Sequence, residues 1–126
     1  MLRLGNQRNA LSIVSDQIGC PTFAGDLAQA LIAVVSAVEK DRCAWGLYHF
    51  AGAQAVSWFE FAETIFKEAK AAGLRTPDQL LPIATKDYPT PAPRPAWSVL
   101  SSDRFSQAFG VSASDWKTAI GQCLRS

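Results

Sequence analysis

The sequence is poor in histidine, cysteine and net charge. Its 126 residues include one histidine and three cysteines, and the formal net charge is +1. Structural zinc sites need clustered cysteine and histidine, so we expect none. A nearly neutral chain has no general electrostatic reason to bind nucleic acid or an anionic membrane. No apolar run reaches the roughly 18 residues of a spanning helix, so neither nucleic acid nor membrane is an expected partner.

The three cysteines are Cys20, Cys43 and Cys123, which lie far apart in the sequence. Cysteines that are few, odd in number and far apart in the sequence are typical of a reducing compartment, so we expect a cytoplasmic protein. Cys20 precedes Pro21 in an expected turn and is a candidate nucleophile. A small buried residue is the simpler interpretation, because no histidine-based constellation supports catalysis at this position.

The sequence also lacks the common catalytic and nucleotide-binding motifs. There is no G-x-G-x-x-G, Walker A loop or G-x-S-x-G. In a Tyr-x-x-x-Lys pair, the lysine lowers the pKa of the tyrosine for proton transfer to a carbonyl. Tyr48 and Tyr88 are instead followed four residues later by Gly52 and Ala92. We therefore assign no catalytic and no cofactor-binding residue within this chain.

What is present is an ordinary globular composition, 48% hydrophobic and 18% charged, arranged as alternating strands and helices. Ser57 and Glu60 form an S-x-x-E capping box, and Thr22 is the expected N-cap of the preceding helix. The pattern predicts an α/β fold with few, short strands covered by about four helices. In chain order we expect a strand at 11–14, a helix at 23–41, a strand at 45–52, a helix at 57–73, a strand at 80–83, a proline-rich segment at 86–100, and helices at 101–110 and 112–124.

Two segments carry candidate binding residues. Asp16 and Gln17 follow the first strand, and ligands of open α/β sheets bind at the carboxyl ends of strands. Gln17 can donate to and accept from a sugar hydroxyl or a base edge. The alternative is a local turn in which these side chains bond to nearby backbone. Spacing alone favours the turn.

The second segment, KDYPTPAPRPAWSVL, is called the proline arm here (residues 86–100). Prolines at every second position exclude a helix and a central strand and make the arm stiff and extended. Arg94 offers a planar set of donors that matches a phosphate, while Tyr88 and Trp97 are candidates for stacking on a base. The alternatives are a proline-rich edge packed over the core and an SH3-type ligand. The interpretation as an SH3-type ligand is the weaker one, because the arm lies between structured elements.

Four stretches together resemble the dTDP-4-dehydrorhamnose reductases. DQIGCPT resembles that family's D-Q-x-G-x-P-T segment, and YPTPAPRPAWSVL resembles its Y-P-T-P-A-x-R-P-x-x-S-x-L stretch. WGLYHFAG with SWFEFAETIF, and FGVSASDWKTAI, are similar to further family segments in the same order. The resemblance implies a Rossmann-type, extended short-chain dehydrogenase/reductase fold. It also implies an oxidoreductase that uses NADPH or NADH to reduce dTDP-4-dehydro-L-rhamnose to dTDP-L-rhamnose for polysaccharide biosynthesis.

The resemblance covers only the family's C-terminal, substrate-binding portion. Residues 1–126 are therefore expected to be a single substrate-binding domain fragment without the N-terminal dinucleotide-binding domain. Alone, it should bind no cofactor and show no activity. The implied partner is a dTDP-sugar, with Arg94 near the pyrophosphate or sugar and Asp16 and Gln17 near the cofactor–substrate cleft.

The resemblance also bears on metal and oligomeric state. Some family members are magnesium-linked dimers through acidic residues, but one acidic position corresponds to Gly25 here, which predicts no metal. Apolar helix faces without a partner predict a possible homo-oligomer. The alternative function is a non-catalytic regulatory or scaffold protein on the same fold, similar to the regulatory subunit of methionine adenosyltransferase.

Overall fold

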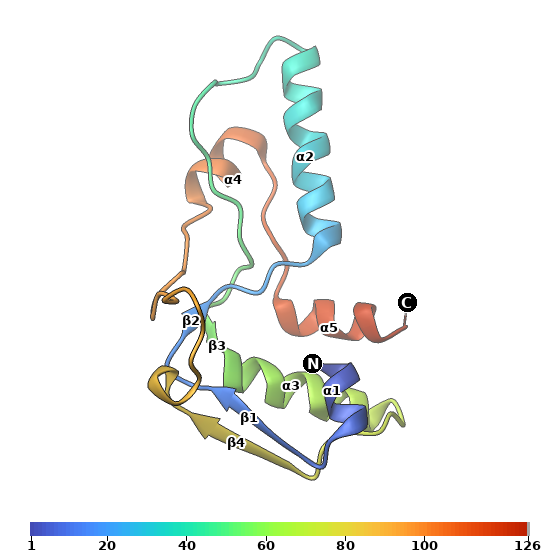
Figure 1. Cartoon of the computed structure of the whole chain (residues 1–126). Helices are drawn as coiled ribbons and strands as arrows, with labels where there is room; N and C mark the ends of the chain where they lie inside the picture. Colours follow the sequence, from blue (N-terminus) through green and yellow to red (C-terminus); the bar gives the residue numbers. More distant parts are fainter. Residues whose placement is uncertain (126) are drawn as a thin grey trace. The chain divides into compact units, whose positions relative to one another are not determined.

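The computed structural model describes residues 1–125 and divides them into two compact units (Figure 1). Unit 1 comprises residues 1–19, 56–98 and 120–125, and unit 2 comprises residues 20–55 and 99–119. Unit 1 holds α1 (Leu2–Gln7), β1 (Ala10–Val14), β2 (Ile18–Gly19), β3 (Val56–Ser57), α3 (Trp58–Ala71), β4 (Gln79–Ile83) and the short 3-10 helix η1 (Thr85–Asp87). Unit 2 holds α2 (Ala24–Glu39) and α4 (Asp103–Phe109), and α5 (Trp116–Arg125) crosses the boundary between the units.

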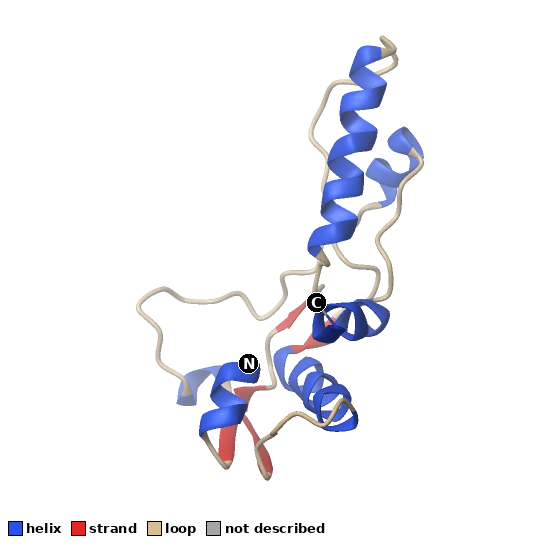
Figure 2. Cartoon of the chain, turned by 90° about the vertical axis from the view of Figure 1, so that its right-hand side faces the viewer, coloured by secondary structure: helices blue, strands red, loops and turns tan. Residues whose placement is uncertain are grey.

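Unit 1 is built on a parallel pair of strands. β1 pairs with β4 in a register that places Leu11 opposite Leu80. Figures 1 and 2 show α1 and α3 above this pair. The core forms where α3 meets β1, around buried Leu11, Ala62 and Phe66. Gly5 of α1 lies so close to the Phe66 ring that a Cβ there would collide with it, which explains a glycine inside this short helix.

The two outer edges of this strand pair differ. The Ser15 amide donates to the Ile83 carbonyl, and the Gln79 amide donates to the Asn9 carbonyl. Backbone groups alternate in direction along a strand, so the residues between these bonding positions point outward. On β4 the outward positions hold Leu80 and Pro82, and Pro82 has no N–H, which suits an edge. On β1 the outward positions hold Ala10, Ser12 and Val14, and no strand within residues 1–125 pairs with them.

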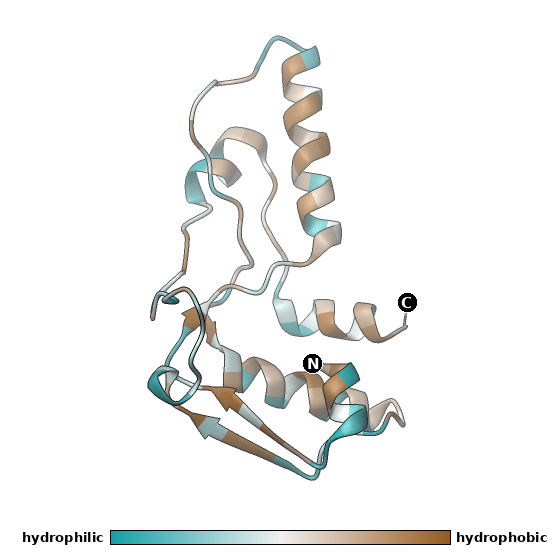
Figure 3. Cartoon of the chain, viewed as in Figure 1, coloured by the Kyte–Doolittle hydropathy of each residue, from teal (hydrophilic) through white to brown (hydrophobic). Residues whose placement is uncertain are grey.

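Unit 2 is organised around aromatic side chains. Buried Phe105 of α4 packs edge-to-face on Phe50, with ring centroids 5.1 Å apart, and also contacts Tyr48 and Phe109. α2 buries little more than Ala30. Figure 3 shows apolar stretches along α2. Its exposed large apolar side chains, called the α2 face below, are Leu27, Leu31, Ile32, Val35 and Val38.

The α/β class and most predicted elements are confirmed. β1, β4 and the helices at 24–39, 58–71, 103–109 and 116–125 lie where expected. The strand predicted at 45–52 is wrong, because these residues run without strand pairing. Three further features were not predicted: α1, the two-residue antiparallel pairing of β2 with β3, and the 3-10 helix η1.

Of the two helix-cap predictions, one is confirmed and one is wrong. The capping box of α3 is confirmed, with the Glu60 amide donating to Ser57 Oγ and the Glu60 carboxylate accepting from the Ser57 amide. Thr22 is not the N-cap of α2. That position belongs to Phe23, which makes no side-chain cap bond. Thr22 Oγ1 instead donates to the Cys20 carbonyl and accepts from the Gly52 amide, so it joins two loops of unit 2.

Candidate functional site

The proline arm is fastened at its far end to the start of β2. The Ile18 amide donates to the Ala96 carbonyl at 2.8 Å, and the Ser98 amide donates to the Ile18 carbonyl at 2.9 Å. Trp97 forms a parallel bridge with Ile18 between these bonds. The Ser98 hydroxyl also donates to the Ile18 carbonyl at 3.1 Å. The end of the arm is therefore held by backbone bonds, as a strand would be.

The near end of the arm is fastened by side chains. One Asp16 carboxylate oxygen accepts from the Thr85 hydroxyl at 2.7 Å, and both oxygens accept from the Thr85 amide at 2.9 and 3.0 Å. These bonds lower the pKa of Asp16, the side-chain bond most strongly. Gln17 Nε2 donates to the same hydroxyl at 3.1 Å. Asp16 and Gln17 thus join the carboxyl ends of β1 and β4 immediately before the arm.

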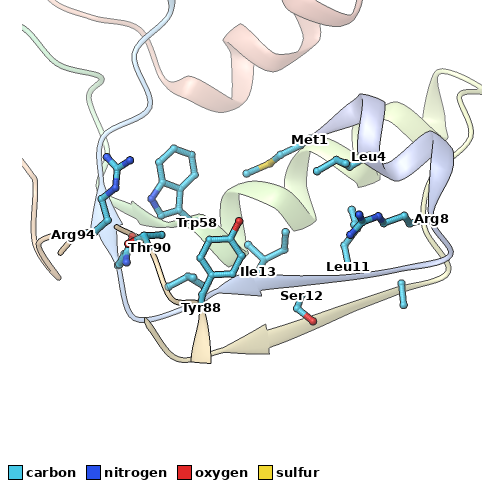
Figure 4. Close-up of a pocket in the computed structure, with 13 residues that line it drawn as sticks. Met1, Leu4, Arg8, Leu11, Ser12, Ile13, Trp58, Tyr88, Thr90 and Arg94 are labelled. Atoms are coloured by element: carbon cyan, nitrogen blue, oxygen red, sulfur yellow. The ribbon is translucent and has the colours of Figure 1, made fainter. Parts of the chain in front are cut away.

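A groove lies beside the arm in unit 1, with a volume of about 720 Å³. Its walls come from α1, β1, the first residue of α3 and the arm. In Figure 4, Arg94, Thr90, Trp58 and Tyr88 gather at one end, while Leu4 and Arg8 lie at the other. All five consecutive residues of β1 line the groove. Alternate side chains of a strand point to opposite faces, so the groove follows the outer edge of β1.

The arm end of the groove combines aromatic rings with a cation. Trp58 and Tyr88 are about half exposed, at 50% and 54%, and Arg94 is exposed. Gln17 is half-buried at the same site, and its carbonyl accepts from the Trp58 amide at 3.3 Å. Exposed rings can stack on a planar or sugar ring, and a guanidinium can bind a phosphate with two parallel bonds. This end is therefore suited to an anionic ligand that carries a ring.

The structure brings together three of the five residues selected from the sequence. Gln17, Tyr88 and Arg94 line the groove, whereas Asp16 and Trp97 do not. The carboxylate of Asp16 is engaged by Thr85, 69 residues away in the sequence, so these bonds are not those of the local turn considered as the alternative. Trp97 is 65% exposed beside β2.

Sequence reasoning did not select Trp58 as a candidate binding residue. It is the first residue of α3, and the capping box places it against the turn that carries Gln17. That box was visible in the sequence and could have indicated a position at the helix end, away from the buried stripe. Arg8 and Thr90, which also line the groove, had no comparable signal.

A resident metal receives no support from the described residues. Within residues 1–125 no group of three or more histidine, cysteine, aspartate or glutamate side chains is placed to hold an ion. Beside Gly25, the Asp26 carboxylate accepts from the amide and hydroxyl of Ser114 at 2.8 and 2.7 Å. Across the same part of the chain, no helix has the length and apolarity to span a membrane.

Comparisons with known proteins agree on one family. The model of the RmlD substrate binding domain matches residues 1–126. The chain is 44% identical over 122 residues to a dTDP-4-dehydrorhamnose reductase of Aggregatibacter actinomycetemcomitans, covering 95% of this chain and 42% of the relative. It is 37% identical to the reductase of Burkholderia thailandensis, covering 99% and 44%. The chain thus spans less than half the length of these curated relatives.

Solved structures give the same result. A dTDP-4-dehydrorhamnose reductase of Bacillus anthracis in complex with NADP aligns with a TM-score of 0.79 at 28% identity, covering 95% of this chain and 39% of that one. A reductase ortholog of Clostridium acetobutylicum aligns with a TM-score of 0.78 at 30% identity, with the same coverage. The fold of residues 1–125 therefore matches part of a larger reductase fold.

Proposed function

The chain belongs to the family of RmlD substrate binding domains, and from this membership we propose its role. It is the sugar-nucleotide-binding portion of an NADPH-dependent dTDP-4-dehydrorhamnose reductase, which converts dTDP-4-dehydro-L-rhamnose to dTDP-L-rhamnose. The observation that carries the proposal is the groove beside the proline arm, with Arg94, Tyr88 and Trp58 at one end. Nothing in the described residues or the reported relatives favours the regulatory alternative.

The groove has the chemistry that a nucleoside diphosphate sugar requires. Its volume of about 720 Å³ lies within the roughly 300–1,000 Å³ of small-molecule pockets. Arg94 supplies donors for the pyrophosphate, and Trp58 or Tyr88 supplies a ring for the thymine or the sugar. Gln17 has a carbonyl oxygen and an amide for sugar hydroxyls, although one of its N–H groups is used by Thr85.

The chemical step needs groups outside this chain. Reduction of a ketone requires a hydride donor and a proton donor, and the sequence contains neither a glycine-rich loop nor Tyr-x-x-x-Lys. In this proposal a dinucleotide-binding domain supplies both, so residues 1–126 alone lack reductase activity and bind no NADPH. The reaction belongs in the cytoplasm, which also suits a chain with only three cysteines.

The edges of the β1–β4 strand pair support the proposal that a further domain adjoins this chain. Parallel sheets are normally larger and covered on both faces, and two strands are marginal alone. Pro82 closes the outer edge of β4, whereas Ala10, Ser12 and Val14 leave the outer edge of β1 open to another strand. We therefore place the remaining sheet of the reductase beside β1, where it would occupy the part of the groove that this strand lines and leave the arm end, at Trp58, Tyr88 and Arg94, to the ligand.

The α2 face supports self-association. No charged residue lies between Leu27 and Val38 in the sequence, and Leu31 is 60% exposed. Exposed apolar patches of this kind mark interaction sites. We propose that a second copy of the chain covers this face.

The first test is calorimetric titration of the chain with dTDP-L-rhamnose. Arg94→Ala should weaken binding by up to about tenfold, because a charge-assisted contact to phosphate is lost. Arg42→Ala is the matched control, since Arg42 is an exposed arginine that does not line the groove. Equal binding by both variants would remove the assignment of Arg94. No binding by a folded wild-type chain would mean that the groove is not a preformed site.

A further inference from the structure

Residues Asp16, Gln17 and Ile18 are bonded to both flanks of the proline arm and to the start of α3. Asp16 and Gln17 bond Thr85 at the near end of the proline arm, and Ile18 bonds Ala96 and Ser98 at its far end. The Gln17 carbonyl accepts from the first amide of α3, that of Trp58. Residues 86–98 are therefore held at both ends by one tripeptide, residues 16–18. We call residues 16–18 the clasp.

The two ends are held by different kinds of bond. At Ile18 the bonds are backbone to backbone, so substitution of a side chain leaves them in place. At Thr85 the arm depends on the Asp16 carboxylate and, through the hydroxyl, on Gln17. Only the near end can therefore be released by changing a single side chain.

The stiffness of the arm makes this near end important for the groove. Tyr88 lies three residues after Thr85, and prolines with fixed φ follow at alternate positions. A chain of this kind transmits a displacement at its start along its length more than a flexible loop does. Tyr88 and Arg94, which line the groove, lie between the two fastened ends.

We propose that Asp16 is a positioning residue for ligand binding, which holds Thr85 and thereby keeps Tyr88 and Arg94 at the groove. It touches no ligand itself, since it does not line the groove. This inference rests on the proposed function and extends it to a residue outside the binding surface. It gives the aspartate and glutamine of DQIGCPT separate roles, with Asp16 fastening the arm and Gln17 both fastening it and facing the groove.

The experiment compares Asp16→Ala with Thr85→Val and Thr85→Ser. The first two variants remove bonds at the near end, whereas serine keeps both the hydroxyl and the amide. Amide hydrogen exchange at residues 85, 87 and 88, whose amides are hydrogen-bonded at the near end, should become faster in Asp16→Ala and Thr85→Val and stay near the wild-type rate in Thr85→Ser, as measured by NMR. Unchanged exchange in Asp16→Ala would overturn the proposal, whether or not the chain binds a ligand.

Binding of dTDP-L-rhamnose supplies the second measurement. Asp16→Ala should weaken binding several-fold, and Asp16→Asn, which keeps one oxygen for the Thr85 amide, should recover part of the loss. In a double-mutant cycle, Asp16→Ala should add little to the combined variant Tyr88→Ala/Arg94→Ala, because Asp16 acts through the contacts that this variant already lacks. Independent, multiplying losses would overturn the proposal, since a merely destabilising change would act in either background.

The two measurements separate this inference from the proposed function. Absence of binding by the wild-type chain contradicts a preformed nucleotide-sugar site but leaves the exchange measurement decisive for the clasp. Normal binding by Asp16→Ala with faster exchange contradicts the positioning role, because the arm would then be free without consequence for the ligand.

Discussion

Units 1 and 2 use their apolar residues in opposite ways. In unit 1 the apolar stripe of α3 meets a sheet, and Phe66 is only 5% exposed. In unit 2 the longest helix of the described residues buries Ala30 but leaves Leu31 60% exposed. Unit 1 also has side-chain hydrogen bonds between distant parts of the chain at the clasp, where Asp16 and Gln17 bond Thr85 beside the groove.

This difference indicates separate tasks for the two units. Burial of the α3 stripe stabilises the walls of the groove within unit 1. The α2 face contributes little to the stability of the described chain and is available to a partner. Unit 2 should therefore depend on a few close backbone approaches more than on a large core, and the following changes test that contrast.

The largest expected effect is in unit 2, at Gly52. A Cβ at this buried position would collide with the Pro21 carbonyl oxygen, which is backbone and cannot rotate away. Gly52→Ala should lower the free energy of unfolding by about 3 kcal/mol or more, as measured by urea denaturation. Gly73→Ala is the control, because Gly73 has φ of 76° with open space around it. It should cost only about 1 kcal/mol for the left-handed conformation. Equal losses would show that the loop at Pro21 moves freely.

Substitution of Leu31 should change the free energy of unfolding less than Gly52→Ala does, but it should weaken self-association of the chain. Leu31→Ser should alter the free energy of unfolding by no more than about 0.5 kcal/mol, since the side chain is largely exposed. It should shift sedimentation velocity profiles from dimer towards monomer. Leu81→Ser is the matched control in unit 1, where Leu81 is 47% exposed on β4. A monomeric wild type at high concentration, or an equal effect of both variants, would contradict association through the α2 face.

The sequence was informative where the determinant is local. The capping box of α3 and the strand of β1 depend on near neighbours, and these predictions are confirmed. The strand expected at 45–52 failed because its aromatic residues pack on α4, a contact between distant parts of the chain. Asp16 was selected for ligand binding because its partner Thr85, 69 residues away, is invisible in a local pattern.

The smallest effect concerns the capping box of α3. Bonds from the Ser57 amide and hydroxyl hold the pKa of Glu60 below its ordinary value of 4.5. A carboxylate whose pKa is lowered by folding stabilises the fold above its unfolded pKa, and this contribution disappears as the pH falls through the folded pKa. Glutamine can still form the box, so Glu60→Gln should cost only a few tenths of a kcal/mol at pH 7. The difference from wild type should shrink as the pH falls through the folded pKa of Glu60.

Urea denaturation of both proteins at pH 7 and at pH 3.5 would measure this effect. Glu63→Gln is the control, because it removes the same charge from an exposed position of α3 outside the box. Asp16 also has a lowered pKa, and its protonation should weaken the clasp over the same range. Both variants retain Asp16, so its contribution cancels when they are compared with wild type. A pH dependence in Glu63→Gln equal to that in Glu60→Gln would mean that helix charge, and not the bonds to Ser57, is responsible.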